Sequence, residues 1–405
     1  MDYWKEVPNF NAVFNFQWRP FSRGIRFAQL SCFQRQAVNH FEFHAEITTK
    51  DQLFRNLLSY AQLNKMNVFD FVPLTFAIDL TSHTYNPDFE KFVTCFNIIS
   101  SAQSTSDKKS PSCEQQCLKT INSKLQLVTF SRDRRAVSHC KAKIAETHFA
   151  GKNLWILKPT GFNRGQGVSV FDSMDVLKGL IKFYSEGPDK VGDSETISKS
   201  KVAPMDQIKS KTFVIQKYIE RPLLLRGRKF DIRVWTLVTQ EMKVYFFREG
   251  YLRTSSSVYS TDEATVCDRN VHLTNNAVQK YGHGYGQFED GNQLSFDQFQ
   301  SYLDQTYPER KVDVYGDLVK QMKDLVVVTM QSVRKKLNAE DRFYCFELFG
   351  YDFFIDEQFK VWLIEVNTNP CLEESSALLR SLLPRMIGIP SVAPTADRRH
   401  DEAHT

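Results

Sequence analysis

The sequence lacks long apolar runs and any large excess of one charge. No stretch approaches the roughly 18 consecutive apolar residues that a membrane-spanning helix needs. Residues 1–6 lack the basic-then-apolar pattern of a secretory signal. The 52 basic and 47 acidic residues leave a formal charge of +5, which permits an acidic partner but does not indicate nucleic acid. We therefore expect a cytoplasmic protein that binds neither membrane nor nucleic acid.

The eight cysteines show no clear metal or disulfide pattern. Cys113 and Cys117 lie four apart, with His139 and Cys140 further on, whereas a zinc site favours tighter pairing and a clear fourth ligand. The chain has 405 residues, 42% of them hydrophobic, which suffices for a sizeable core in two or three subdomains. Reduced thiols and no zinc site are therefore expected.

Hydrophobic periodicity predicts a mixed α/β (α+β) fold. Helices are expected around 53–61 and over 174–186 and 315–337. Strands are expected near 154–157, 168–171, 213–219, 230–238 and 243–247, and a hairpin pairs 345–355 with 360–366. Polar composition predicts a linker over 100–112, disorder over 187–210, a loop over 254–270 and a frayed tail from 390.

Two of these strands carry charge where a buried strand should carry none. Successive side chains point to opposite faces, so Lys229, Asp231 and Arg233 share one face. Glu365 and Asn367 share a face in the second strand, among residues suited to a core. A carboxylate buried in such a place is either paired or holds a cation. The pattern indicates either a solvated face with cross-strand ion pairs or a polyanion and metal site.

The predicted hairpin places Asp352 on a strand antiparallel to the strand of Glu365 and Asn367. Two carboxylates and an amide oxygen form the hard, oxygen-rich set that Mg²⁺ prefers when it bridges nucleotide phosphates. The alternative is that Asp352 simply caps the turn.

Phosphate contacts are indicated near Lys158, which ends a buried strand before a loop with Gly165 and Gly167. Its ammonium and the loop's N–H groups could both face phosphate oxygens, although an ordinary hairpin turn is the alternative. No Gly-Lys-Ser/Thr follows, so this is not a Walker A loop. Residues 216–219 could border a purine or form a plain edge strand.

Three further segments are placed in loops beside these strands. They are Arg253-Thr-Ser-Ser256, His272-Leu-Thr-Asn-Asn276 and Tyr281-Gly-His-Gly-Tyr-Gly286. The first two bring a basic residue and short polar side chains close to the charged strands. The third is expected to be a flexible loop and not a nucleotide site.

Six ordered motifs together resemble the tubulin-tyrosine ligase-like family over residues 150–376. They are Lys-Pro-Thr-Gly-Phe-Asn-Arg-Gly-Gln-Gly (158–167), Gln-Lys-Tyr-Ile-Glu-Arg-Pro-Leu (216–223), Gly-Arg-Lys-Phe-Asp-Ile-Arg-Val-Trp (227–235), Arg-Glu-Gly-Tyr-Leu-Arg-Thr-Ser (248–255), His-Leu-Thr-Asn-Asn (272–276) and Ile-Glu-Val-Asn-Thr-Asn-Pro (364–370). Six motifs in order are far more specific than any one of them.

The resemblance implies an ATP-grasp fold with an N-terminal domain (1–150), a central domain (151–222), a C-terminal domain (223–389) and a tail (390–405). ATP would lie between the sheets of the last two domains. ATP would phosphorylate a carboxylate, and the amine of an amino acid would then attack the acylphosphate. The implied acceptor is a glutamate γ-carboxylate in the acidic tail of tubulin.

The resemblance also implies roles for individual residues. Lys229, Asp231, Arg233 and Arg253 would be catalytic. ATP would contact Lys229 and Asp231 and, in addition, Lys158, Arg164, Gly165, Gln166, Gly167, Gln216, Lys217, Tyr218, Ile219, His272, Thr274 and Asn275. Magnesium would be held by Asp352, Glu365 and Asn367.

The choice of amino acid leans towards glycine. Residues 216–224, Asn39-His40-Phe41 and 48–51 look most like the glycine-adding branch, and Arg164 is compatible with it, although glutamate-adding members share that arginine. A polyglutamylase is therefore the alternative, and a pseudoenzyme that binds ATP or microtubules is the alternative of another class. A monomer acting on tubulin or microtubules is expected, in the cytoskeleton and in a cilium or flagellar axoneme. No basic extension follows 376, so soluble tubulin or another acidic protein is a further alternative substrate.

Overall fold

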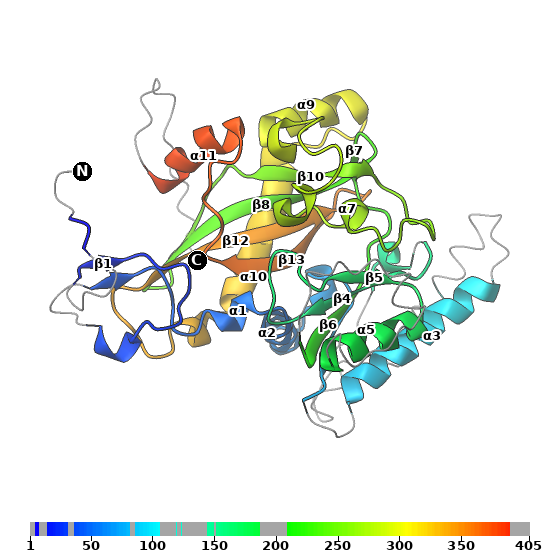
Figure 1. Cartoon of the computed structure of the whole chain (residues 1–405), viewed down its shortest axis with the longest axis horizontal. Helices are drawn as coiled ribbons and strands as arrows, with labels where there is room; N and C mark the ends of the chain where they lie inside the picture. Colours follow the sequence, from blue (N-terminus) through cyan, green and yellow to red (C-terminus); the bar gives the residue numbers. More distant parts are fainter. Residues whose placement is uncertain are drawn as a thin grey trace.

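The computed structural model describes residues 5–7, 14–30, 36–81, 86–105, 119, 123, 144–149, 151–186 and 209–388. Two antiparallel sheets with helices on their outer faces make up most of this part of the chain (Figure 1). No helix among these residues is long and apolar enough to cross a membrane. The mixed α+β class predicted from periodicity is confirmed.

The smaller sheet has four strands. Their order is β3 (Thr75–Asp79), β6 (Thr212–Lys217), β4 (Trp155–Pro159) and β5 (Ser169–Phe171). Helices α3 (Pro87–Thr105) and α5 (Met174–Glu186) cover one face, where Phe92 packs on Trp155 and Tyr184 on Phe213. Because side chains alternate along a strand, Ile156, Lys158 and Gln216 point to the other face and line a pocket.

The larger sheet has five strands in its main path, with two short strands beside it. The path runs β11 (Gln293–Ser295), β10 (Tyr251–Val258), β8 (Arg228–Thr239), β12 (Phe346–Ile355) and β13 (Val361–Thr368), and β7 (Leu224–Leu225) and β9 (Val244–Phe246) also pair with β8. Helix α10 (Val319–Leu337) lies against its outer face, where Thr329 hydrogen bonds Tyr351. The predicted hairpin is confirmed as β12 and β13, with Asp352 opposite Glu365.

The N-terminal region packs against both sheets. It contains β1 (Phe16–Gln17), β2 (Ala37–Val38), α1 (Ala45–Thr48) and α2 (Lys50–Leu63), and it also supplies β3 to the smaller sheet. His40 and the backbone N–H of Phe41 both contact the buried carboxylate of Glu347, at 3.1 and 2.9 Å. These bonds join the region to β12. The predicted domain boundaries at 150, 222 and 389 stay a prediction.

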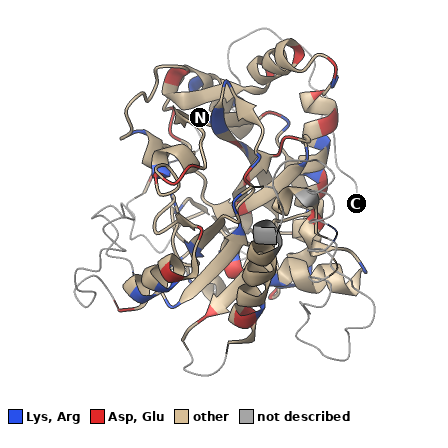
Figure 2. Ribbon diagram, turned by 90° about the vertical axis from the view of Figure 1, so that its right-hand side faces the viewer, with Lys and Arg blue, Asp and Glu red and all other residues tan. Residues whose placement is uncertain are grey.

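The remaining elements are short or cap the larger sheet. They are η1 (Phe27–Gln29), η2 (Val68–Asp70), η3 (Glu146–His148), α7 (Arg269–His272), α8 (Asn276–Gln279), η5 (Asp290–Asn292), α9 (Phe296–Thr306), the π-helical turn η6 (Val314–Leu318) and α11 (Ala377–Ile387). Figure 2 marks charged residues on the outer helices and also on the strands between them, and Lys158, Asp231 and Asp352 on these strands are buried. The sheet interior is therefore not purely apolar.

Two sequence predictions are corrected. Helix α3 extends through Thr105, into the segment predicted as a linker. Strand β10 runs to Val258, so Arg253 lies on a strand and not in a loop, and the polar residues Thr254, Ser255 and Ser256 that follow it are buried. Residues 106–112, 187–208 and 389–405 lie outside the described part of the chain, as do Cys113, Cys117, His139 and Cys140.

Candidate active site

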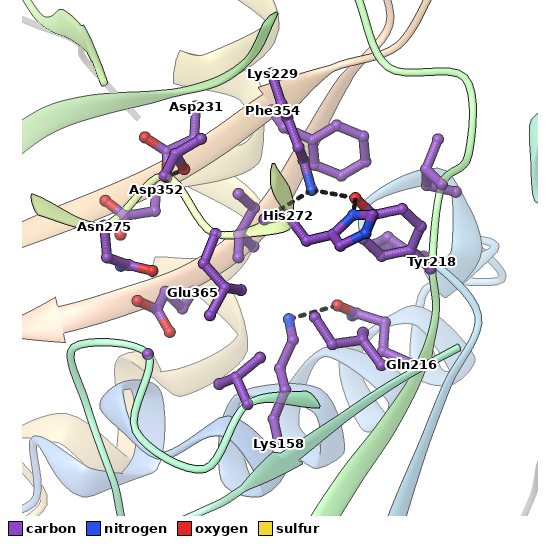
Figure 3. Close-up of a pocket in the computed structure, with 18 of the residues that line it drawn as sticks. Lys158, Gln216, Tyr218, Lys229, Asp231, His272, Asn275, Asp352, Phe354 and Glu365 are labelled. Atoms are coloured by element: carbon purple, nitrogen blue, oxygen red, sulfur yellow. Dashed lines mark hydrogen bonds between the residues drawn. The ribbon is translucent and has the colours of Figure 1, made fainter. Parts of the chain in front are cut away.

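A cavity lies between the two sheets and opens to solvent (Figure 3). Most of its polar lining was predicted from the sequence. It includes Lys158, Gly165, Gln216, Lys217, Tyr218, Ile219, Lys229, Asp231, His272, Thr274, Asn275, Asp352 and Glu365. Apolar walls come from Ile156, Val168, Leu273, Phe354 and Ile364. The cavity is therefore apolar on its walls and charged along one side.

The charged side is a ladder of alternating charge across three strands. Arg253 pairs with Asp231 through two bonds of 2.6 and 2.7 Å, and Arg233 pairs with Asp352 through bonds of 2.5 and 3.0 Å. Arg253 also reaches Asp352, at 2.8 Å. All four residues are at least nine-tenths buried, so the face is not solvated. The predicted cross-strand ion pairing is correct. Asp231 and Asp352 line the cavity, whereas Arg233, Arg253 and Asn367 are not among its lining residues.

Burial and neighbouring charge push the two aspartates in opposite directions. Burial raises the pKa of Asp231 above its ordinary value, although Arg253 and the Thr274 hydroxyl oppose the shift. Burial alone would also raise the pKa of Asp352, but Arg233 and Arg253 hold it at about 2. Asp352 is therefore ionised at neutral pH and binds both guanidinium groups.

Two lysines face the cavity from opposite sheets. Lys158 donates to the Gln216 side-chain oxygen at 2.8 Å, and burial lowers its pKa to about 8 against the raising effect of Glu365. Lys229 donates to the Tyr218 hydroxyl at 2.9 Å, and burial lowers its pKa to about 7 although Asp231 opposes this. A bound polyanion would stabilise both ammonium groups.

Hydrogen bonds determine the tautomer of His272. Its Nε2 lies 3.1 Å from the carbonyl oxygen of Thr265, which can only accept, so Nε2 carries the proton. Its Nδ1 therefore accepts from the Tyr218 hydroxyl at 2.8 Å. Burial lowers the pKa of His272 to about 4, so the ring is neutral at pH 7. The Tyr218 oxygen is left to accept from Lys229.

Lys217 differs from the other pocket lysines because its ammonium is fully engaged. It donates to the carbonyl oxygens of Leu154 and Tyr218, at 2.7 and 3.1 Å, and to Glu220 at 2.9 Å. Glu220 in turn accepts the backbone N–H of Leu154 at 2.8 Å. The side chain of Lys217 thus fixes the strand edge, and its ammonium already has three acceptors within the protein.

The glycine loop is folded against the opposite wall. Arg164, Gly165 and Gly167 have φ of +60°, +74° and +66°, which explains the glycines. The Gly165 carbonyl accepts from Arg269 at 2.6 Å, and a Cβ on Gly165 would lie 3.3 Å from the Asn275 oxygen. Arg164, Gln166 and Gly167, which were predicted to contact ATP, do not line the cavity.

The oxygen-rich trio converges at the end of the ladder. The Asn367 amide nitrogen lies 3.2 Å from oxygens of both Asp352 and Glu365. Asp352 already accepts from two arginines, so Glu365 is the less engaged carboxylate. No cluster of three His, Cys, Asp or Glu side chains with metal-binding geometry occurs in the described residues. The donor types nevertheless suit a hard cation such as Mg²⁺.

Lys50 is a pocket residue that sequence reasoning missed. It begins α2, donates to the Phe162 carbonyl at 2.6 Å and lies 3.8 Å from Glu365. Lys50 therefore touches the glycine loop and the carboxylate side at once. Residues 48–51 were noted only for their resemblance to the glycine-adding branch, because the contacts of Lys50 come from residues over 100 positions away.

Two antiparallel sheets on either side of a cavity lined by lysines and carboxylates are consistent with an ATP-grasp-like α+β fold. A family model described as the tubulin-tyrosine ligase family matches residues 29–389. The chain belongs to the tubulin-tyrosine ligase family.

Named relatives include both glycine-adding and glutamate-adding proteins. The chain is 31% identical over 285 residues to tubulin glycylase 3B of Tetrahymena thermophila, covering 70% of this chain and 22% of that protein. It is 26% identical to the probable alpha-tubulin polyglutamylase Ttll1 of the same ciliate, covering 95% of this chain and 76% of the relative. It is 32% identical over 240 residues to the probable tubulin polyglutamylase TTLL9 of Mus musculus, covering 55% of this chain and 49% of that protein. The chain thus spans about a fifth of the glycylase and about half of the mouse relative.

Proposed function

We propose that this chain is an ATP-dependent ligase that joins an amino acid to a glutamate γ-carboxylate in the acidic tail of tubulin. The observation that carries the proposal is a cavity lined by Lys158, Lys229, Asp231 and Asp352, in which both aspartates are bonded to Arg253. A nucleotide, an acidic acceptor and a phosphoryl group in transfer all need positive charge. The names of the relatives support tubulin as the partner.

The nucleotide would bind at the apolar end of the cavity. The base would lie between the aliphatic side of the smaller sheet and Phe354 and Ile364, next to the backbone of 216–219. Lys158 and Lys229 would contact the phosphates, with Gly165 to Gly167 folded over them. Both lysines gain charge on contact, because burial holds their pKa values low in the ligand-free pocket.

Arg233 and Arg253 would stabilise the charge that develops as the γ-phosphoryl passes to a carboxylate oxygen. That step breaks the bond between the γ-phosphorus and the β–γ bridging oxygen of ATP, and forms an acylphosphate and ADP. The amine of the amino acid then attacks the acyl carbon, inorganic phosphate leaves, and the amine loses a proton to form the amide. Asp231 would hold Arg253 in place through its two bonds.

Magnesium would be held by Glu365, Asn367 and Asp352. A turn of the Asn367 amide by 180° presents its oxygen beside the two carboxylates. The ion supplies neutralising charge between phosphate oxygens when bound. This chain's own contribution is to hold three oxygen donors on neighbouring strands.

Glycine is the amino acid that we favour. Both arginines of the ladder already pair with aspartates, which suits an amino acid without a second carboxylate. Two similar relatives are named tubulin glycylases. Glutamate is the alternative, and two relatives are named as polyglutamylases. We expect a monomer associated with the cytoskeleton, and a ciliary or axonemal setting.

Mass spectrometry of tubulin tests the proposal directly. Purified tubulin is incubated with the 405-residue chain, ATP, Mg²⁺ and either glycine or glutamate. Steps of one glycine mass on a tail glutamate support a glycylase, whereas glutamate steps keep the chemistry and replace the amino acid. No product with either one, despite ATP binding, favours another acidic acceptor or a pseudoenzyme. Glu365→Gln serves as the control variant and should abolish product while leaving the fold intact.

A further inference from the structure

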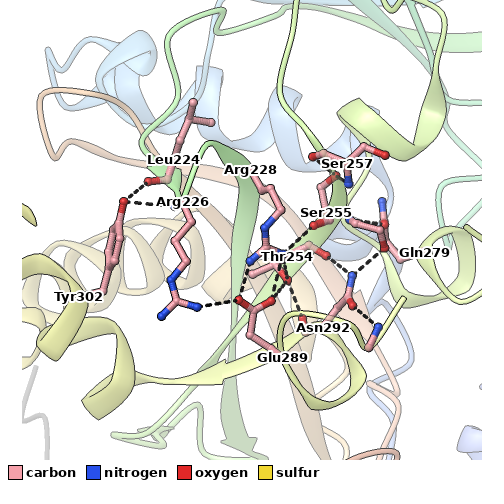
Figure 4. Close-up of polar contacts among 12 residues, drawn as sticks. Leu224, Arg226, Arg228, Thr254, Ser255, Ser257, Gln279, Glu289, Asn292 and Tyr302 are labelled. Atoms are coloured by element: carbon pink, nitrogen blue, oxygen red, sulfur yellow. Dashed lines mark hydrogen bonds and ion pairs between the residues drawn. The ribbon is translucent and has the colours of Figure 1, made fainter. Parts of the chain in front are cut away.

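A second polar network lies beside the pocket, between β10 and the segment that follows it (Figure 4). At its centre is Gln279, the last residue of α8, whose side chain is 1% exposed. Its oxygen accepts the backbone N–H of Ser256 at 2.8 Å. Its amide nitrogen donates to the carbonyl oxygens of Asn270 and Leu273, at 2.9 and 2.6 Å. One buried carboxamide thus joins β10 to residues 270–273.

The segment that Gln279 holds forms one wall of the cavity. Leu273, Thr274 and Asn275 line it. Thr274 donates to Asp231 at 2.6 Å, and the carbonyl oxygen of His272 accepts from Lys229 at 3.0 Å. A displacement of residues 272–275 would therefore disturb Asp231, which holds Arg253, and Lys229, which is expected to contact the phosphates.

Further along the chain, Glu289 lies before β11 and forms an ion pair with Arg228 of β8. Arg228 donates to Glu289 through both terminal nitrogens, at 3.0 and 2.5 Å, and to the Ser255 carbonyl at 2.9 Å. Asn292 donates to the Thr254 carbonyl at 3.0 Å and accepts the N–H of Gly286 at 2.7 Å. The glycine-rich loop, predicted to be flexible, is therefore tied to β8 and β10.

The network and the pocket share two strands. Arg228 precedes Lys229 on β8, and Thr254 follows Arg253 on β10. Because neighbouring side chains on a strand point to opposite faces, Arg228 and Thr254 point away from the sheet face that carries Lys229 and Arg253. Only a carboxamide can accept from Ser256 and donate to two carbonyl groups at once. Because the bonds are buried, their loss would not be offset by water.

We infer that Gln279 is a positioning residue that sets the 272–275 wall at the distance from β8 that nucleotide binding needs. The inference rests on the proposed function, because that wall is taken as part of the ATP site. Gln279 touches neither the cavity nor its contents, and acts through the carbonyl of Leu273 and the bonds of His272 and Thr274. The Arg228–Glu289 pair ties Glu289, further along the chain before β11, to β8.

The test compares Gln279→Met with Gln300→Met in the full chain. Gln300 also accepts one backbone N–H, from Val314, and donates to a carbonyl, of Val312, but it lies on α9 away from the cavity. Calorimetry with ATP and Mg²⁺ measures nucleotide affinity without turnover. We expect Gln279→Met to weaken ATP binding by roughly tenfold or more, and Gln300→Met to leave it within about twofold.

A thermodynamic cycle separates positioning from general destabilisation. Thr274→Val removes the hydroxyl that bonds Asp231, and Gln279→Met and Thr274→Val should be non-additive in ATP affinity if both act through the same wall. Additive losses, or an unchanged affinity in Gln279→Met, would overturn the inference. If Gln279→Met does not fold, Gln279→Glu replaces it in the test, because glutamate keeps the shape of the side chain and the oxygen that accepts the Ser256 N–H. It should also weaken ATP binding, and partly recover it at low pH, where a protonated carboxyl donates again.

The two proposals fail in different ways. If the wild-type chain binds ATP but modifies no tubulin tail, the proposed ligase activity is refuted. The ATP affinity of Gln279→Met relative to the wild-type chain then still tests the role of Gln279. If the wild-type chain ligates and the Gln279→Met variant has the same KM for ATP and the same kcat, only the positioning role is refuted. Wild-type chain that binds no ATP would overturn both.

Discussion

The ammonium nitrogen of Lys229 lies 2.9 Å from the Tyr218 hydroxyl oxygen and 4.4 Å from the centre of the same ring. Tyr218 therefore contacts this lysine through its hydroxyl and its ring together. The hydroxyl proton is directed to His272, so the oxygen is free to accept from Lys229. The lysine is held towards the cavity by a hydrogen bond and a cation–π contact.

Removal of the Tyr218 hydroxyl should weaken nucleotide binding. In Tyr218→Phe, Lys229 loses an acceptor and His272 loses a donor, while the ring stays. We expect the KM for ATP to rise several-fold and the KM for the amino acid to stay unchanged. Tyr302→Phe is the matched control, because the Tyr302 hydroxyl donates to the Leu224 carbonyl and Tyr302 does not line the cavity. Equal kinetics in the two variants would contradict the role given to the Tyr218 hydroxyl.

Nucleotide affinity should fall as the pH rises from about 7 to 9. The pKa of Lys229 is lowered to about 7 and that of Lys158 to about 8, so both lose their proton in this range unless an anion is bound. ATP binding at pH 8 should therefore take up protons. Calorimetry in two buffers of different ionisation enthalpy measures that uptake, and proton release would contradict the prediction.

The stability of the ligand-free chain should rise with pH because of these two lysines, whereas the affinity for ATP should fall. Their folded pKa values lie below the ordinary 10.5, so the unfolded chain binds more protons between about pH 7 and 10. These two groups therefore make the free energy of unfolding rise with pH across this window. Lys229→Met, which removes one of them, should reduce that slope in chemical denaturation at several pH values. A steeper slope in the variant would show the sign to be wrong.

The sequence was sufficient for the strands and for most of the pocket, because alternation placed Lys229, Asp231 and Arg233 on one face. It could not show that Arg253 bridges Asp231 and Asp352, since pairing across three strands depends on register. Lys50 was missed for the same reason. Lys217 could not be told from the pocket lysines, because its partners Leu154 and Glu220 meet it only in the folded sheet.

Lys217→Met should lower stability more than it lowers ATP affinity. The ammonium is fully buried, and its loss leaves the Glu220 carboxylate without its cation, which costs about 3–5 kcal/mol. Lys217→Met/Glu220→Gln removes the unpaired charge and should recover part of that loss. Denaturant unfolding and ATP calorimetry measure the two effects separately. If Lys217→Met instead lost much of its ATP affinity at unchanged stability, the predicted contact between Lys217 and ATP would be supported.

Gly350 should be essential for the arginine ladder. A Cβ at this position of β12 would lie 2.8 Å from the Pro370 Cβ and 3.2 Å from the Arg233 Nη1. Neither neighbour can move freely, because Pro370 follows β13 and Arg233 is bonded to Asp352. Gly350→Ala should therefore displace the Arg233 guanidinium and reduce ligation at least tenfold, with ATP still bound by the lysines.

Gly179→Ala is the matched control for that substitution. Gly179 lies within α5, with no atom within 4 Å of an added Cβ. Alanine should stabilise that helix by up to about 1 kcal/mol and leave ligation unchanged. Full ligation by Gly350→Ala would show that the position of Arg233 does not govern the transfer step. If Gly350→Ala lost ATP binding as well as ligation, the substitution would have disturbed the whole cavity. Gly350 and Asp352 lie on β12, whereas Lys158 lies on β4 and Lys229 on β8.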